Sequence, residues 1–171
     1  ELGLTQEERN ILQDAALFPL KVSVCQKIEA ELSRLQESLI SYASKPNLYF
    51  QSSGKISRGE NYHSLPYRVL DYPLFADRED LLIFRSMMLW GKGFSFHVLL
   101  TGNPRQALAQ VLWKRKDQAP FTPYLALHDN PWVWHQDEEY WKPLTNISEK
   151  EWTHHESIYH YQKISFILPI D

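Results

Sequence analysis

The chain has 171 residues, of which 43% are hydrophobic and 23% are charged, and its formal net charge is -3. This length and composition match one globular domain and argue against a disordered, fibrous or collagen-like chain. So small a net charge gives no overall field that would attract nucleic acid or an anionic membrane, and we expect neither as a partner.

Cysteine content and hydropathy give expectations about the cellular location of the protein. Cys25 is the single cysteine, so an intramolecular disulfide is excluded and a reducing, cytoplasmic location is expected. The most apolar stretch, residues 81–90, is interrupted by Arg85 and Ser86 and is shorter than the roughly 18–20 apolar residues that cross a bilayer. We therefore interpret it as a core element of a soluble protein.

The first forty residues predict two helices. Thr5 and Glu8 form a capping-box pattern before apolar residues at helical spacing, which indicates a helix over about 6–16. Pro19 ends this helix and can occupy the first turn of the next one. The second helix has one apolar stripe, made of Val24, Ile28, Leu32, Leu35 and Leu39.

The central part of the chain predicts a loop, a strand and a buried helix. Residues 43–66 are rich in Ser, Gly and Pro and are expected to form a loop within the domain, with a possible short strand at 48–50. Residues 67–72 lie between two prolines, which favours a short strand near an edge. Asp77 and Asp80 precede an apolar stretch that we predict as a third helix reaching Trp90 and stopped by glycines.

The second half alternates strands and helices without a regular repeat. Residues 94–101 alternate with period two and predict a strand whose polar face carries Ser95, His97 and Thr101. A helix over about 103–116, a strand at 124–128, a short helix opened by the capping box of Ser148 and Glu151, and a strand at 164–168 follow. We expect one α+β domain over residues 1–171, with N-terminal helices packed on a small, mainly antiparallel sheet.

The central segment also carries a resemblance. Residues 55–73, KISRGENYHSLPYRVLDYP, and residues 80–102, DLLIFRSMMLWGKGFSFHVLLTG, are similar to a group of uncharacterised bacterial proteins from the Bacteroidetes. The resemblance covers roughly the central third of the chain. It implies a family but no activity and no catalytic residue.

Imidazole and indole groups gather near the C-terminus. Five of the seven histidines and four of the six tryptophans follow residue 127, beside the acidic residues Asp129, Asp137, Glu138 and Glu139. Such residues either pack as partly exposed strand and loop side chains or line a pocket for a flat ligand. The candidate ligand-binding residues are Arg85, His97, His128, Trp132, Trp134, His135 and Trp141.

Some of these candidates have an alternative structural interpretation. Trp132 and Trp134 would point to the same face if they lay in a strand, and that face could be core or binding surface. Arg85 could bind a carboxylate or phosphate of a ligand, or form a buried salt bridge to Asp80 or Asp71. The sequence leaves both choices open.

Function is constrained mainly by the motifs that are missing. The chain has no HExxH, GxSxG, GxGxxG or GxxxxGK[ST] pattern, and one cysteine excludes a thiolate zinc site. Our leading hypothesis is non-catalytic binding of a small molecule or partner protein in an aromatic, histidine-lined pocket. The alternatives are a metal-dependent hydrolase that uses some of His97, His128, His135, Asp129 and Asp137, and a homo-oligomer that associates through the helix at 24–39. The sequence identifies neither the ligand nor a cofactor.

Overall fold

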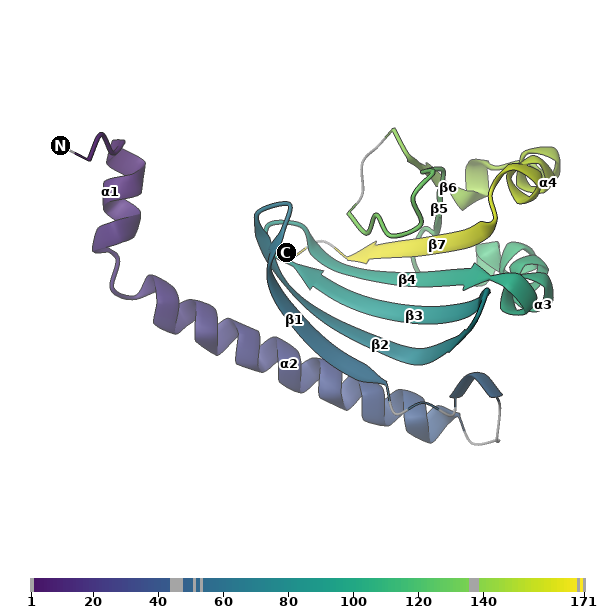
Figure 1. Ribbon diagram of the computed structural model, residues 1–171, viewed down its shortest axis with the longest axis horizontal. Coiled ribbons are helices and arrows are strands. Elements are labelled where there is room, and N and C mark those ends of the chain that lie inside the picture. Colours follow the sequence, from purple (N-terminus) through teal and green to yellow (C-terminus); the bar gives the residue numbers. More distant parts are fainter. Residues whose placement is uncertain are drawn as a thin grey trace.

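The computed structural model describes residues 2–43, 48–50, 52, 54–135, 139–168 and 170. Over these residues the chain forms four α-helices and a seven-stranded antiparallel sheet with the strand order β1-β2-β3-β4-β7-β5-β6 (Figure 1). This confirms the predicted α+β class. The helices are α1 (Gln6–Gln13), α2 (Leu17–Tyr42), α3 (Gly102–Lys114) and α4 (Glu149–Ile158), with 3-10 turns η1 (Leu48–Phe50), η2 (Lys116–Gln118) and η3 (Leu144–Asn146). The strands are β1 (Lys55–Tyr62), β2 (Leu65–Asp77), β3 (Asp80–Leu89), β4 (Gly93–Thr101), β5 (Tyr124–Ala126), β6 (Trp141–Pro143) and β7 (Tyr161–Leu168).

The third predicted helix is wrong, because residues 80–89 form strand β3. The stretch is apolar on both faces because both faces of the sheet are covered there. The apolar residues therefore show neither the 3.6-residue period of a helix nor the two-residue period of a half-buried strand, and the pattern alone does not distinguish the two. Asp77 pairs with Asp80 across a tight hairpin in which Arg78 adopts a φ of 54°. The carboxylate of Asp80 instead caps α3, accepting a hydrogen bond from the backbone N–H of Asn103 at 2.8 Å.

The predicted loop at 43–66 also needs correction. Its second half contains β1, which pairs with β2, and its first half contains the turn η1 in place of the possible strand at 48–50. With β1 on one side and β3 on the other, β2 is a long internal strand and not a short edge strand. The Ser, Gly and Pro content of this segment therefore predicted more loop than the structure contains. The N-terminal helices, β4, α3, β5, α4 and β7 all lie close to their predicted ranges.

The two faces of the sheet have different partners, and we call them the outer and inner faces. Leu70 and Tyr72 on the outer face pack against Leu32 of α2. Farther along the same face, Ile164 of β7 packs against α3 and α4. On the inner face, Val69 and Met87 pack under the irregular segment 127–135, through the indole of Trp134. The candidate residues therefore gather on the inner face. None of the helices in the described part of the chain is long and apolar enough to cross a membrane.

Candidate functional site

A row of polar side chains crosses the inner face of the sheet. Asp71 of β2, Arg85 of β3, His97 of β4 and Ser165 of β7 are successive partners in the antiparallel register. Directly paired residues share a face, so these four side chains lie side by side beneath segment 127–135. Only the register of the sheet brings them into one row.

Arg85 forms the salt bridge that the sequence offered as one alternative. Its Nε and Nη2 donate to the two carboxylate oxygens of Asp71, each at 2.7 Å. This paired, forked geometry is the strong form of an arginine–carboxylate interaction. Arg85 lies on a strand and not on the predicted helix, and its Nη1 makes no hydrogen bond to any residue that the structure describes.

His97 is fully buried within the row. Its Nδ1 lies 2.5 Å from the hydroxyl of Ser165 and its Nε2 lies 2.9 Å from that of Ser95. Burial, and then the positive charges of Lys163 and Arg85, hold its pKa well below the usual value. The imidazole is therefore neutral at physiological pH, and both its nitrogens are engaged.

Lys163 fastens segment 127–135 to the sheet. This lysine of β7 is buried, and its side-chain nitrogen Nζ donates to the backbone carbonyls of Pro131, at 3.0 Å, and of Val133. Burial, together with the charge of Arg85, lowers the pKa of Lys163 to about 6. The same nitrogen lies 3.9 Å from the centre of the Trp134 ring.

Tyr62, at the end of β1, supplies a second attachment for the segment. Its hydroxyl oxygen accepts hydrogen bonds from the backbone N–H groups of Trp134, at 2.8 Å, and His135, at 3.4 Å. Since the oxygen already accepts twice, its own proton is directed to Nδ1 of His135, 3.0 Å away. The indole N–H of Trp141 adds a further bond to this region, to the carbonyl of His135 at 3.2 Å.

Trp134 is the centre of the cluster. Its ring is buried, with the guanidinium carbon of Arg85 at 4.0 Å and the imidazole of His97 at 5.3 Å. Trp132 approaches it at a centroid distance of 6.0 Å in an edge-to-face arrangement, and 51% of Trp132 remains exposed. A guanidinium over an indole face and edge-to-face indoles are both favourable arrangements.

An aromatic hollow of about 160 Å³ opens beside these rings. We define the aromatic hollow by its lining residues, which are Ser57, Tyr62, Tyr67, Val69, Arg85, Met87, Trp132 and Trp134. A second hollow of about 140 Å³ lies against Trp134 and His135, and Lys92, Ser95 and Ile167 also contribute to it. Trp134 thus takes part in both.

The structure brings most, but not all, of the predicted site residues together. Arg85, Trp132 and Trp134 line the aromatic hollow. His97, His135 and Trp141 contact this group from below or beside it. His128 does not join them: its Nδ1 accepts from the backbone N–H of Asn130 at 2.9 Å, and its ring packs on Tyr140.

The strand geometry considered for Trp132 and Trp134 does not occur. Segment 127–135 is irregular, and it is held by the bonds from Lys163 and Tyr62. The two indoles therefore meet edge to face at the wall of the hollow and do not stand side by side on a sheet face.

Two lining residues, Tyr62 and Tyr67, were not among the predicted site residues, although aromatic side chains in a loop favour a functional role. Tyr62 falls within the predicted loop and Tyr67 at the start of a predicted short strand, yet they lie on β1 and β2 with rings 6.2 Å apart. Gly59 gives Tyr67 its position, because a Cβ at Gly59 would lie 2.4 Å from the tyrosine ring.

Lys163 was also missed, because it precedes the predicted strand at 164–168 and its burial follows from the register of β7 in the sheet. Side chains two residues apart on a strand share a face, so Lys163 of β7 lies on the inner face with Tyr161 and Ser165. A lysine between two inward-facing residues indicates a buried amine that needs acceptors, which segment 127–135 supplies.

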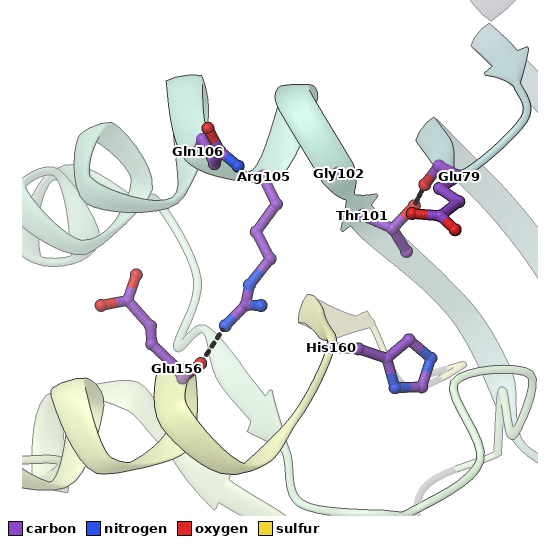
Figure 2. A pocket seen from close by; sticks show the side chains of 7 residues that line it. All are labelled: Glu79, Thr101, Gly102, Arg105, Gln106, Glu156 and His160. Atoms are coloured by element: carbon purple, nitrogen blue, oxygen red, sulfur yellow. Dashed lines mark hydrogen bonds between the residues drawn. The ribbon is translucent and has the colours of Figure 1, made fainter.

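A larger hollow lies elsewhere, at the end of the sheet where α3 begins (Figure 2). It measures about 720 Å³, and Arg105 reaches across it from α3 to donate to the carbonyl of Glu156 at 2.7 Å. Its other lining residues are Glu79, Thr101, Gly102, Gln106 and His160. Its lining is mostly charged or polar, and His160 is the single ring among the lining residues, so this hollow offers no wall of aromatic rings to a flat ligand.

The hypothesis of a metal-dependent hydrolase can be compared with the arrangement of the described side chains. Within the described ranges, no three His, Cys, Asp or Glu side chains come together as a metal ion would require. His97 and His128, both considered for a hydrolase, already use ring nitrogens in hydrogen bonds. Asp137, another residue of that hypothesis, lies outside the described residues.

Comparisons of the chain with protein-family models, with curated proteins and with solved structures found no match. The resemblance of the central segment to Bacteroidetes proteins therefore stays a prediction.

Proposed function

We propose that the chain is a non-catalytic binding domain that holds a small planar molecule, with a single aromatic ring, in the aromatic hollow. The observation that carries this proposal is the convergence of two indoles, two phenols and one guanidinium around a space of about 160 Å³. Pockets of this composition bind flat ligands through their apolar walls and orient them through a few polar groups.

The size of the hollow limits the ligand. A cavity of roughly 150 Å³ accepts a molecule as large as benzene, whereas drug-sized ligands need about 300 Å³ or more. A space of about 160 Å³ therefore fits one six-membered ring with a short substituent.

The walls favour binding because they are already in place. Lys163 and Tyr62 hold the segment that carries the two indoles, so little side-chain or loop ordering accompanies ligand entry. The half-exposed indole of Trp132 stands at the rim, where a ligand ring can stack on it.

Arg85 indicates which substituent the ring carries. Its charge is balanced by Asp71, so the site does not demand an anion. The Nη1 group of Arg85 remains available as a donor among the described residues, which favours a ring bearing an acceptor such as a carbonyl or carboxylate oxygen.

The proposal is tested by saturation-transfer NMR with benzamide, benzoate and, as a non-aromatic control, cyclohexanecarboxylate. We expect signal from both aromatic compounds and much less from the cyclohexane ring, because stacking needs a flat face. Trp132→Ala should weaken binding of the aromatic compounds about tenfold, which is a typical effect of losing one aromatic contact. Phe121→Ala is the matched control, since Phe121 is 47% exposed and does not line the hollow.

Two results would remove the proposal. One is the absence of saturation transfer to either aromatic compound at millimolar concentration. The other is equal binding by the wild type and Trp132→Ala, which would place the ligand away from the hollow.

A further inference from the structure

The N-terminal part of the chain projects away from the sheet (Figure 1). Helix α1 has no buried residue, and in α2 the first buried side chain is Cys25. We call residues 2–24 the arm. Its exposed large apolar side chains are Leu2, Ile11, Leu12, Leu17, Phe18, Leu20, Val22 and Val24.

The apolar character of α2 changes where the helix meets the sheet. One exposed stripe begins with Leu17, Leu20 and Val24 and then continues, at the same helical spacing, as Lys27, Glu31 and Arg34. The stripe is thus apolar only within the arm and charged over the part of α2 that covers the sheet. Because Phe18 and Val22 add a second side, the first two turns of α2 are apolar nearly all round, which is typical of a helix that is enclosed.

The short helix α1 points to the same conclusion. It has only eight residues, and a helix of that length is not stable in water without tertiary contacts, even with its capping box. Ile11 and Leu12 form its apolar side and are 58% and 71% exposed. A surface that covers α1 is therefore expected.

The exposed area is large enough for a stable interface. From the exposed fractions of the eight side chains, and roughly 150–200 Å² for each large side chain, the arm offers on the order of 800 Å². The largest apolar patch of a typical monomer covers about 300–600 Å². About 800 Å² per partner is the size of a standard protein–protein interface.

Charge favours a second copy as the occupant. Residues 5–16 carry Glu7, Glu8 and Asp14 against the single Arg9. Residues 17–28 carry Lys21, which also pairs with Glu60 of β1, and Lys27, which lies just beyond the arm, and they include no acidic residue. Two arms packed antiparallel would bring the acidic α1 of each copy toward the basic start of the partner's α2. The acidic α1 is in contrast poorly suited to an anionic membrane, whose amphipathic helices carry Lys and Arg on the polar face.

We infer that two copies of this chain associate through their arms, with α1 and the first turns of α2 of both copies forming a four-helix contact. The helix at 24–39, which the sequence suggested for self-association, is not this surface. Its stripe of Ile28, Leu32, Leu35 and Leu39 packs on the sheet and on η1.

The inference is tested by light scattering of the full chain over about 1–100 µM, with three variants. We expect the mass of a dimer, twice 20.2 kDa, for the wild type. Phe18→Asp and Ile11→Asp should each raise the dimer dissociation constant about tenfold or more and leave the circular dichroism of the sheet unchanged. Ile158→Asp is the matched control, because Ile158 of α4 is 59% exposed and lies outside the arm.

A monomeric wild type throughout this range would overturn the inference, as would a dimer that persists in Phe18→Asp and Ile11→Asp. So would a dimer that Ile158→Asp disrupts as strongly as the arm variants do. Flotation of a monomeric wild type with vesicles of zwitterionic or anionic lipid would assign the arm to a membrane and equally reject the second copy.

Discussion

Replacing Lys163 by Met tests how segment 127–135 is held. The substitution keeps most of the buried stem but removes the donor to the carbonyls of Pro131 and Val133. The pKa of Lys163 is about 6 in the folded protein against 10.5 in the unfolded chain. Between these values the unfolded chain binds a proton that the folded protein lacks, so the wild-type stability rises with pH.

The size of the effect follows from that shift. Each pH unit adds about 1.4 kcal/mol to the stability of the wild type, whereas a methionine at this position cannot titrate. The stability difference between wild type and Lys163→Met should therefore grow by about 4 kcal/mol from pH 7 to pH 10. At pH 10 the wild type should be the more stable protein, because the variant has lost two hydrogen bonds worth about 1 kcal/mol each and left their carbonyls buried.

Urea unfolding followed by circular dichroism at pH 7, 8, 9 and 10 measures this difference. Groups that Lys163 does not influence cancel between the two proteins, and His97, whose pKa Lys163 helps to lower, titrates below this pH range. Parallel stability curves, with a difference that does not change with pH, would refute a buried, uncharged Lys163.

Four further predictions probe the surrounding contacts. Gly59→Ala should displace the ring of Tyr67, since the new Cβ would lie 2.4 Å from it, and benzoate binding should be lost while the fold by circular dichroism is kept. Tyr62→Phe removes three hydrogen bonds to the segment and should speed amide hydrogen exchange at Trp134 and His135 without affecting α3 or α4. The ring nitrogens of His97 should show the neutral form in NMR spectra at pH 5.5, because burial lowers the pKa of this imidazole. For the same reason the free energy of unfolding should fall as the pH drops below 6.5, the pKa of histidine in the unfolded chain. Glu151, whose pKa is lowered to about 2 chiefly by Lys142, should titrate closer to its ordinary value of 4.5 in Lys142→Met, and its contribution to stability is lost as pH falls from that value toward 2.

Local signals in the sequence predicted much of the fold. The capping boxes at Thr5 and Ser148 both form as expected, and the alternation over 94–101 gives strand β4. The prediction of a helix at residues 80–89 was wrong because this stretch becomes a strand by pairing with β2 and β4, and no local sequence pattern contains that pairing. The same limit applies to β1, whose polar residues become a strand only beside β2.

The candidate site was predicted in its residues more than in its geometry. Arg85, Trp132 and Trp134 were selected for their chemistry, and they do meet at the aromatic hollow. Tyr67 was left out of the predicted site and Lys163 was missed, because their positions depend on the register of the sheet: both lie on the inner face beneath a segment that is distant in sequence. His128 was included because its imidazole belongs to the histidine cluster in the sequence, but its Nδ1 accepts from the backbone N–H of Asn130 and its ring packs on Tyr140, away from the aromatic hollow.

The most direct test of the aromatic hollow is an isotope-filtered NOE experiment on the protein with bound benzoate. The geometry predicts contacts from the ring protons of benzoate to the side chains of Trp132, Tyr67 and Met87. Contacts confined to other surfaces, such as Ile158 and Tyr159 of the groove along α4, would contradict the proposed binding site.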